Sequence, residues 1–117
     1  MKLRPLLVLG LLGLVAATMP CQADTKAFQL VIKDHVFTPD SIVIPAYQKV
    51  RLIIHNQDDV AEEFDSFDLN REKAIFANRR ATLFIGPLAP GEYSFFGEFH
   101  PVSARGVIIV EAEADVD

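Results

Sequence analysis

Imidazole and carboxylate side chains gather near the ends of several apolar segments in this chain of 117 residues. His100 follows an aromatic stretch, and Glu98 lies two positions before it, so a loop could turn both side chains toward one ion. The acidic pair Glu62 and Glu63 lies further back. Nitrogen and oxygen donors of this kind suit iron, manganese, zinc or Cu(II), whereas Cu(I) prefers sulfur. If these side chains bind a metal, it would be a hard or borderline ion; otherwise they are a loop histidine and a solvated acidic strand start.

The sequence shows no hydrolase or transferase signature. Ser94 and Ser103 have no motif that supplies a base and an orienting acid. The chain has no glycine loop that would cradle phosphates, and its histidines and cysteine lack the paired spacing of zinc ligands. Any enzymatic role would be at most ferroxidase-like, and it would depend on a bound redox metal.

The first residues have the pattern of an export signal. Lys2 and Arg4 lead into an apolar run over residues 5–17, and small residues follow before Asp24. We expect a signal peptide from Met1 to Ala23 that is cut after Ala23, and a periplasmic protein without a membrane span in the mature chain. The apolar run is too short to span a bilayer comfortably.

Composition narrows the classes of partner. The net charge is −5, and the predicted signal removes two basic residues but no acidic ones. Nucleic acid is therefore an unlikely ligand, since its binding depends on Lys and Arg that neutralise phosphates. The only cysteine, Cys21, lies in the predicted signal, so the rest of the chain has no disulfide and no thiolate ligand.

The rest of the chain alternates with a period of two, which is typical of strands. Residues 28–32 form a first such segment, 41–44 a second and 82–85 a later one. Residues 50–54 are nearly continuous in apolar side chains, which predicts a strand covered on both sides. Residues 62–67 are predicted as a strand, followed by an irregular arm to Asn78. Short strands separated by Pro and Gly turns predict one all-β domain, a sandwich over residues 24–117.

Several short motifs occur in cupredoxin order. They are Phe37-x-Pro39, the strand end Ile42–Ala46, Asn56 after an apolar strand, and Gly91-x-Tyr93-x-Phe95. The chain looks like a cupredoxin over residues 24–117, so a Greek-key cupredoxin-like β-sandwich is implied. The strings Glu63–Ser66 and Gly97–Pro101 are similar to those of the EfeO-type cupredoxin-like group, especially small periplasmic members associated with bacterial ferrous-iron uptake.

The resemblance also exposes departures from a blue copper site. Such a site has a histidine soon after the Asn56-type turn, then a cysteine, a histidine three positions later and often a methionine. These positions fall on Glu62 or Glu63, on Gly97, on His100, and near Ala104 or Arg105. Only one of the four ligands remains, which excludes copper held by two histidines and a thiolate.

What the resemblance implies instead is a metal site with His100 and a carboxylate. If Phe64 points into the core, Glu62 shares its side of the strand and Glu63 faces away. The family register nevertheless favours Glu63, and a bulge would exchange the two. Glu98 is a further candidate, although strand alternation points it outward.

His35 is the last candidate, because the loop with Phe37-x-Pro39 packs beside the Gly97 loop in this architecture. A second imidazole from His35 would raise the affinity for a metal ion sharply.

The sequence thus predicts a periplasmic protein that binds iron or copper and acts in iron uptake, by binding, presenting or oxidising Fe(II) beside a permease. The expected partners are the metal ion and a periplasmic or membrane iron-transport protein. Two alternatives stay open. One is a metal-free interaction module on the same fold, and the other is an electron-transfer subunit of a copper enzyme assembly.

Overall fold

The structure is a computed structural model that describes residues 2–3, 10, 13–14 and 25–113. Most of the predicted signal peptide, Met1–Ala23, and its cut after Ala23 lie outside these residues. Within the described part of the chain, no helix has the length and apolar character needed to cross a bilayer.

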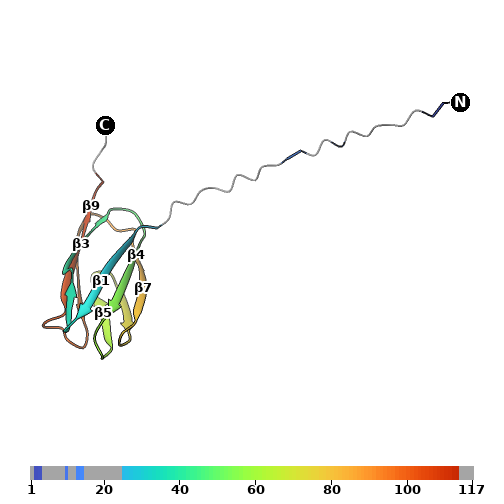
Figure 1. The fold of residues 1–117 in the computed structure, drawn as a ribbon. Helices are drawn as coiled ribbons and strands as arrows, with labels where there is room; N and C mark the ends of the chain where they lie inside the picture. The colour runs from blue at the N-terminus through green and yellow to red at the C-terminus, as the bar shows by residue number, and fades with distance from the viewer. Residues whose placement is uncertain (1, 4–9, 11–12, 15–24, 114–117) are drawn as a thin grey trace.

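Residues 27–111 fold into two sheets packed face to face (Figure 1). The first has the order β2–β1–β4–β7 and consists of β2 (Val36–Thr38), β1 (Ala27–Lys33), β4 (Val50–Asn56) and β7 (Arg80–Ile85). The second has the order β3–β9–β8–β5–β6 and consists of β3 (Ser41–Pro45), β9 (Arg105–Glu111), β8 (Gly91–Gly97), β5 (Glu62–Ser66) and β6 (Arg71–Ile75). The predicted all-β sandwich is confirmed.

The core lies between the sheets and follows the alternation in the strands. Leu30 and Ile32 of β1 face it, as do Leu52 and Ile54 of β4. Three buried phenylalanines fill its centre, with ring centroids 5.0–6.3 Å apart: Phe37, Phe64 and Phe95. Because a buried Phe contributes roughly 1.5–3 kcal/mol, these rings anchor the strands on which the site is built.

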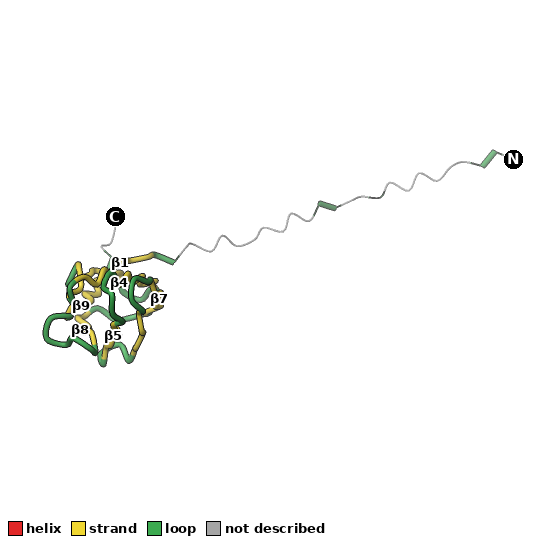
Figure 2. Tube along the Cα trace, turned by 60° about the horizontal axis from the view of Figure 1, so that its bottom comes forward, coloured by secondary structure: helices red, strands yellow, loops and turns green. Residues whose placement is uncertain are grey.

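Two of the strand pairs are parallel. β1 runs parallel to β4, and β3 runs parallel to β9, whereas the other strand pairs are antiparallel. Strands that are neighbours in a sheet are thus often distant in sequence, as expected for the predicted Greek-key sandwich. Figure 2 shows the strands and their connecting loops with the lower end of Figure 1 turned forward.

Two predictions about individual segments are wrong, and one short strand was not predicted. Residues 71–75 form β6 and not an irregular arm, and residues 36–38 form the short strand β2. Both are edge strands, and four of the five residues of β6 are exposed, so β6 carries little alternation to read. β4 is not covered on both sides, since Arg51 is exposed and Ile53 only half-buried on its outer face.

Three connections meet at the end of the sandwich opposite the start of β1 (Figure 1). They are the two-residue turn Asp34-His35 between β1 and β2, the segment from β4 into the start of β5, and the loop of residues 98–104 between β8 and β9. This end of the fold therefore collects side chains from the first, middle and last parts of the chain.

Candidate metal centre

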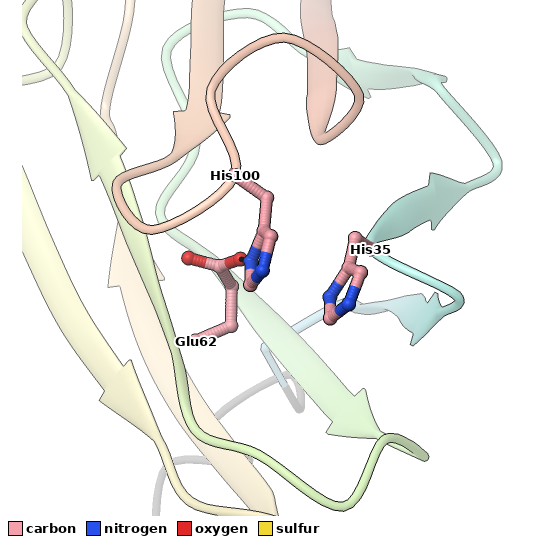
Figure 3. Close-up of side chains that lie close together, drawn as sticks. All are labelled: His35, Glu62 and His100. Carbon is pink, nitrogen blue, oxygen red and sulfur yellow. Dashed lines mark hydrogen bonds and ion pairs between the residues drawn. The ribbon is translucent and has the colours of Figure 1, made fainter.

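His35, Glu62 and His100 converge at this end of the sandwich (Figure 3). One ligand atom from each lies within 4.8 Å of the other two. The two imidazole rings stack with centroids 3.5 Å apart and an angle of 13° between their planes. The cluster offers two nitrogen donors and one carboxylate, which is a donor set that transition metals accept.

Glu62 is the buried member of the cluster, with 2% of the residue exposed. Its Oε1 accepts hydrogen bonds from the backbone N–H of Glu63 at 3.0 Å and of Phe99 at 2.9 Å. Its Oε2 lies 2.8 Å from Nδ1 of His100. A buried carboxylate is costly unless it is paired, and here both oxygens have partners. Glu62 is therefore fixed in one orientation.

Asp58 holds the turn that carries His35. Asp34 and His35 both have positive φ, 52° and 60°, as a type I′ hairpin turn requires. Asp58 accepts a hydrogen bond from each of their backbone N–H groups, at 2.8 and 3.0 Å, and its Oδ2 lies 3.5 Å from Nδ1 of His35. A carboxylate behind a histidine fixes the ring and increases its basicity as a ligand.

The charge of Asp58 is maintained by the same turn. Burial raises the pKa of its carboxyl group, but the backbone N–H groups of His35 and Asp34 outweigh this, with help from the charges of His35 and Lys33. The net result is a pKa below the ordinary value for aspartate. Asp58 therefore stays ionised behind His35 at neutral pH.

The loop that carries His100 is braced by its own backbone. The N–H of Gly97 donates to the carbonyl of Ala104 at 2.8 Å across its base, and the N–H of Ala104 donates to the carbonyl of His100 at 2.9 Å. The Ser103 hydroxyl donates to the carbonyl of His35 at 2.7 Å. The two histidine-bearing loops are thus joined directly by a hydrogen bond.

The five residues proposed from the sequence divide into two groups. His35, Glu62 and His100 form the cluster, with Glu62 on the core side of β5 as strand alternation predicts. Glu63 lies instead with Asp65 and Glu72, whose carboxylate oxygens are within 4.8 Å of one another. The cluster therefore contains Glu62 and not the neighbour that the family register favoured.

Glu98 joins the second group. A hydrogen bond with Asp65 raises the pKa of Glu98 above its ordinary value. Partial desolvation and the negative charges of Asp65, Glu63 and Glu72 raise it further. Glu98 is exposed, and its side chain lies with these carboxylates and not with His100. The outward orientation expected from strand alternation accounts for this separation.

Sequence reasoning missed the roles of Asn56 and Asp58. Asn56 is fully buried, and its amide donates to the carbonyls of Val60 at 2.8 Å and Ile75 at 3.0 Å. Its Oδ1 accepts from the N–H of Asp58 at 3.0 Å. The Asn-x-Asp spacing after a strand is an Asx-turn signal that could have indicated a fixed loop. It could not have indicated that the loop supports His35.

The donor set fits some ions and not others. Oε2 of Glu62 and Nδ1 of His100 are 2.8 Å apart, at hydrogen-bond distance, so both atoms would face one ion only when the ion replaces this contact. A thiolate-bound copper does not fit, because residues 25–113 contain no cysteine and Gly97 holds the position where the resemblance implies one. The side chains of His35 and His100 are 41% and 31% exposed, so the cluster is accessible from solvent.

Comparison with known proteins identifies relatives in sequence. Residues 5–110 match the sequence profile of a cupredoxin-like domain. An uncharacterized protein of Rickettsia prowazekii (strain Madrid E) is 48% identical over 82 residues, which are 70% of this chain. The match spans 66% of the length of that relative.

Solved structures resemble the fold at low sequence identity. Auracyanin A, a "blue" copper protein of Chloroflexus aurantiacus, is 12% identical with a TM-score of 0.65, over 75% of this chain and 100% of that one. The metal-binding domain of the Cu(I)-exporting P-type ATPase of Streptococcus pneumoniae is 11% identical with a TM-score of 0.63, over 73% and 84%. A purple cupredoxin of Nitrosopumilus maritimus is 20% identical with a TM-score of 0.55, over 75% and 100%. These likenesses establish the fold, and together with the sequence match they show that the chain belongs to the cupredoxin-like domain family.

Proposed function

We propose that this protein binds a divalent transition-metal ion, ferrous iron in the first place, through His35, Glu62 and His100. The observation that carries the proposal is the convergence of two imidazoles and one carboxylate within 4.8 Å. Two histidines and one carboxylate with open positions are the donor set typical of non-haem Fe(II) sites. The lack of a thiolate donor in residues 25–113 argues against the copper chemistry that the fold family suggests.

The proposed role is iron uptake in the periplasm, with Fe(II) as cargo that the protein binds and presents to a permease. The export pattern in residues 1–23 and the resemblance to small periplasmic iron-uptake cupredoxins support this role. The partial exposure of His35 and His100 also supports it, because an ion held there stays open to solvent and to a partner on one side.

Metal titration tests the proposal. The protein, produced without residues 1–23 and freed of metal, is titrated anaerobically with Fe(II), and separately with Zn(II) and Cu(II), in competition with a chelator of known affinity. Alanine variants of His35, Glu62 and His100 should each bind at least about tenfold more weakly, a loss of about 1.4 kcal/mol. His55→Ala is the matched control, since His55 is a half-buried histidine on the outer face of β4.

Two results would contradict metal binding. One is that no ion binds more tightly than about millimolar. The other is that His55→Ala and His100→Ala weaken binding equally. For the uptake role, the measurement is iron accumulation in cells that express the His100→Ala variant; uptake equal to wild type would refute it.

A metal-free interaction module is the second candidate function. It is favoured by one observation, the full pairing of the Glu62 carboxylate by two backbone N–H groups and His100, which holds the loop without an ion. Elemental analysis of protein purified from iron-replete cells distinguishes the two candidates. A folded protein without a stoichiometric metal would support the module.

A further inference from the structure

Gly97 is buried at the end of β8, directly beside the cluster, and its backbone does not explain why it is a glycine. Among the described glycines, positive φ occurs at Gly86 and Gly91 and not at Gly97. Gly97 lies in a regular strand and is paired with Phe64 of β5. A residue with a side chain could adopt this backbone, so the reason for glycine must be space.

The space beside Gly97 is filled by the Glu62 carboxylate. A Cβ atom on Gly97 would lie 2.7 Å from Cδ and 2.9 Å from Oε2 of Glu62, and 2.8 Å from Cβ of Ala104. Carbon atoms that are not bonded attract one another at about 3.5–4.0 Å and repel strongly below that. A side chain at position 97 and the present orientation of Glu62 therefore exclude each other.

Glu62 cannot swing aside without loss. Its Oε1 is held by the N–H groups of Glu63 and Phe99, and its Oε2 is the oxygen that faces His100. Displacing the carboxylate would break these contacts and leave two part-buried backbone N–H groups without their partner, which costs free energy. The oxygen nearest to the missing Cβ, Oε2, is also the one that faces His100.

We infer that Gly97 is a specificity-determining residue of the metal site. Because Gly97 has no side chain, the carboxylate of Glu62 can occupy that space and supply an oxygen donor. A side chain at position 97 would displace it and could supply a different donor. This inference rests on the proposed metal binding. An oxygen donor beside two imidazoles selects harder ions, whereas a sulfur donor from position 97 would select softer ones. Positions 62 and 97 thus act as a pair, in which one side chain must be small when the other reaches the ion.

The first test needs no metal. Urea unfolding is measured for wild type, Gly97→Ala, Glu62→Ala and the double variant. Gly97→Ala should lower the unfolding midpoint in wild type, and this loss should shrink or vanish in the Glu62→Ala background. Adding Ala104→Gly removes the second close contact and should complete the rescue. Glu62→Asp, which shortens the side chain by one carbon, serves as the background if Glu62→Ala does not fold.

The outcomes of this test separate clearly. A Gly97→Ala protein that fails to fold, together with a folded Gly97→Ala/Glu62→Ala double variant, supports the inference in its strongest form. An equal loss of midpoint with and without Glu62 overturns it. So does a triple variant that remains unfolded, because position 97 would then need glycine for a reason other than Glu62.

The second test exchanges the donor and uses Co(II) under anaerobic conditions. Gly97→Cys in the Glu62→Ala background should bind Co(II) and show sulfur-to-cobalt charge-transfer absorption that wild type lacks. Gly97→Cys with Glu62 retained should not show it. Equal absorption in both variants, or none in a folded double variant that binds Co(II), would overturn the inference. If wild type binds no metal, the proposed function fails, while the unfolding experiment still decides whether the two positions share one space.

Discussion

Replacing Asn56 gives the sharpest test of how the loop behind His35 is held. This residue is fully buried at the end of β4, and its side chain makes three hydrogen bonds. Two of them reach the carbonyls of Val60 and Ile75, and the third fixes the N–H of Asp58. In Asn56→Ala, all three partners lose their bond at once.

The expected cost follows from the burial of each partner. The buried carbonyl of Ile75 would be left without a donor, which costs about 1–3 kcal/mol. The other two bonds are only partly buried and contribute about 0.5–1.5 kcal/mol each. The free energy of unfolding should therefore fall by about 2–6 kcal/mol, a large part of the roughly 5–15 kcal/mol that a domain has.

Urea unfolding followed by circular dichroism measures this loss, with Gln57→Ala as the control. Gln57 is the exposed neighbour of Asn56, and an exposed substitution usually changes stability by less than about 0.5 kcal/mol. The Asn56→Asp variant keeps the acceptor for Asp58 but turns a carboxylate oxygen toward two carbonyls. Its deficit should therefore shrink as acid protonates that group. Equal midpoints for Asn56→Ala and Gln57→Ala would refute the reasoning.

The remaining predictions concern charge, packing and metal release. Hydrogen bonds from the Ser94 N–H and hydroxyl hold the pKa of Asp68 below its ordinary value. Asp68→Asn should therefore be less stable than wild type at neutral pH. This difference in stability should disappear as the pH falls through the lowered pKa, and thermal unfolding at several pH values measures it. Gly106→Ala should destabilise the fold by about 1–3 kcal/mol, since the new Cβ would overlap the ring of Phe95, and the urea midpoint measures this loss. Metal binding should release protons and weaken in acid, because imidazole and carboxylate must be unprotonated to ligate, and calorimetry in two buffers of different ionisation enthalpy measures the release.

The sequence was sufficient to predict the central strands, but it was not sufficient to predict the strands at the sheet edges. β1 and β4 could be predicted because their buried and exposed positions alternate or form dense apolar runs. β6 could not, since its charged residues face solvent on both sides and its strand character comes from pairing with β5. The alternation of apolar and polar residues reflects burial of one face of a strand. A strand with both faces exposed therefore shows no alternation from which it could be predicted.

For the site, strand alternation singled out Glu62 as the side chain on the core side of β5 beside Phe64. That prediction of orientation agrees with the structure, whereas its role as a ligand stays a prediction. The contribution of Asp58 could not be foreseen, because it depends on a turn that is brought to it by the pairing of β1 with β4. The sequence also could not reveal that a side chain at position 97 would clash with Glu62. That clash depends on distances between atoms of two strands, β8 and β5.

The position of the three clustered side chains along the chain has a consequence for timing. One sits in the first hairpin, one at the start of β5, and the last beyond β8. His100 lies beyond β8, so the cluster can form only when the chain from His35 through His100 is available. A chain that still lacks residue 100 would therefore have an incomplete cluster, however well its earlier strands have formed.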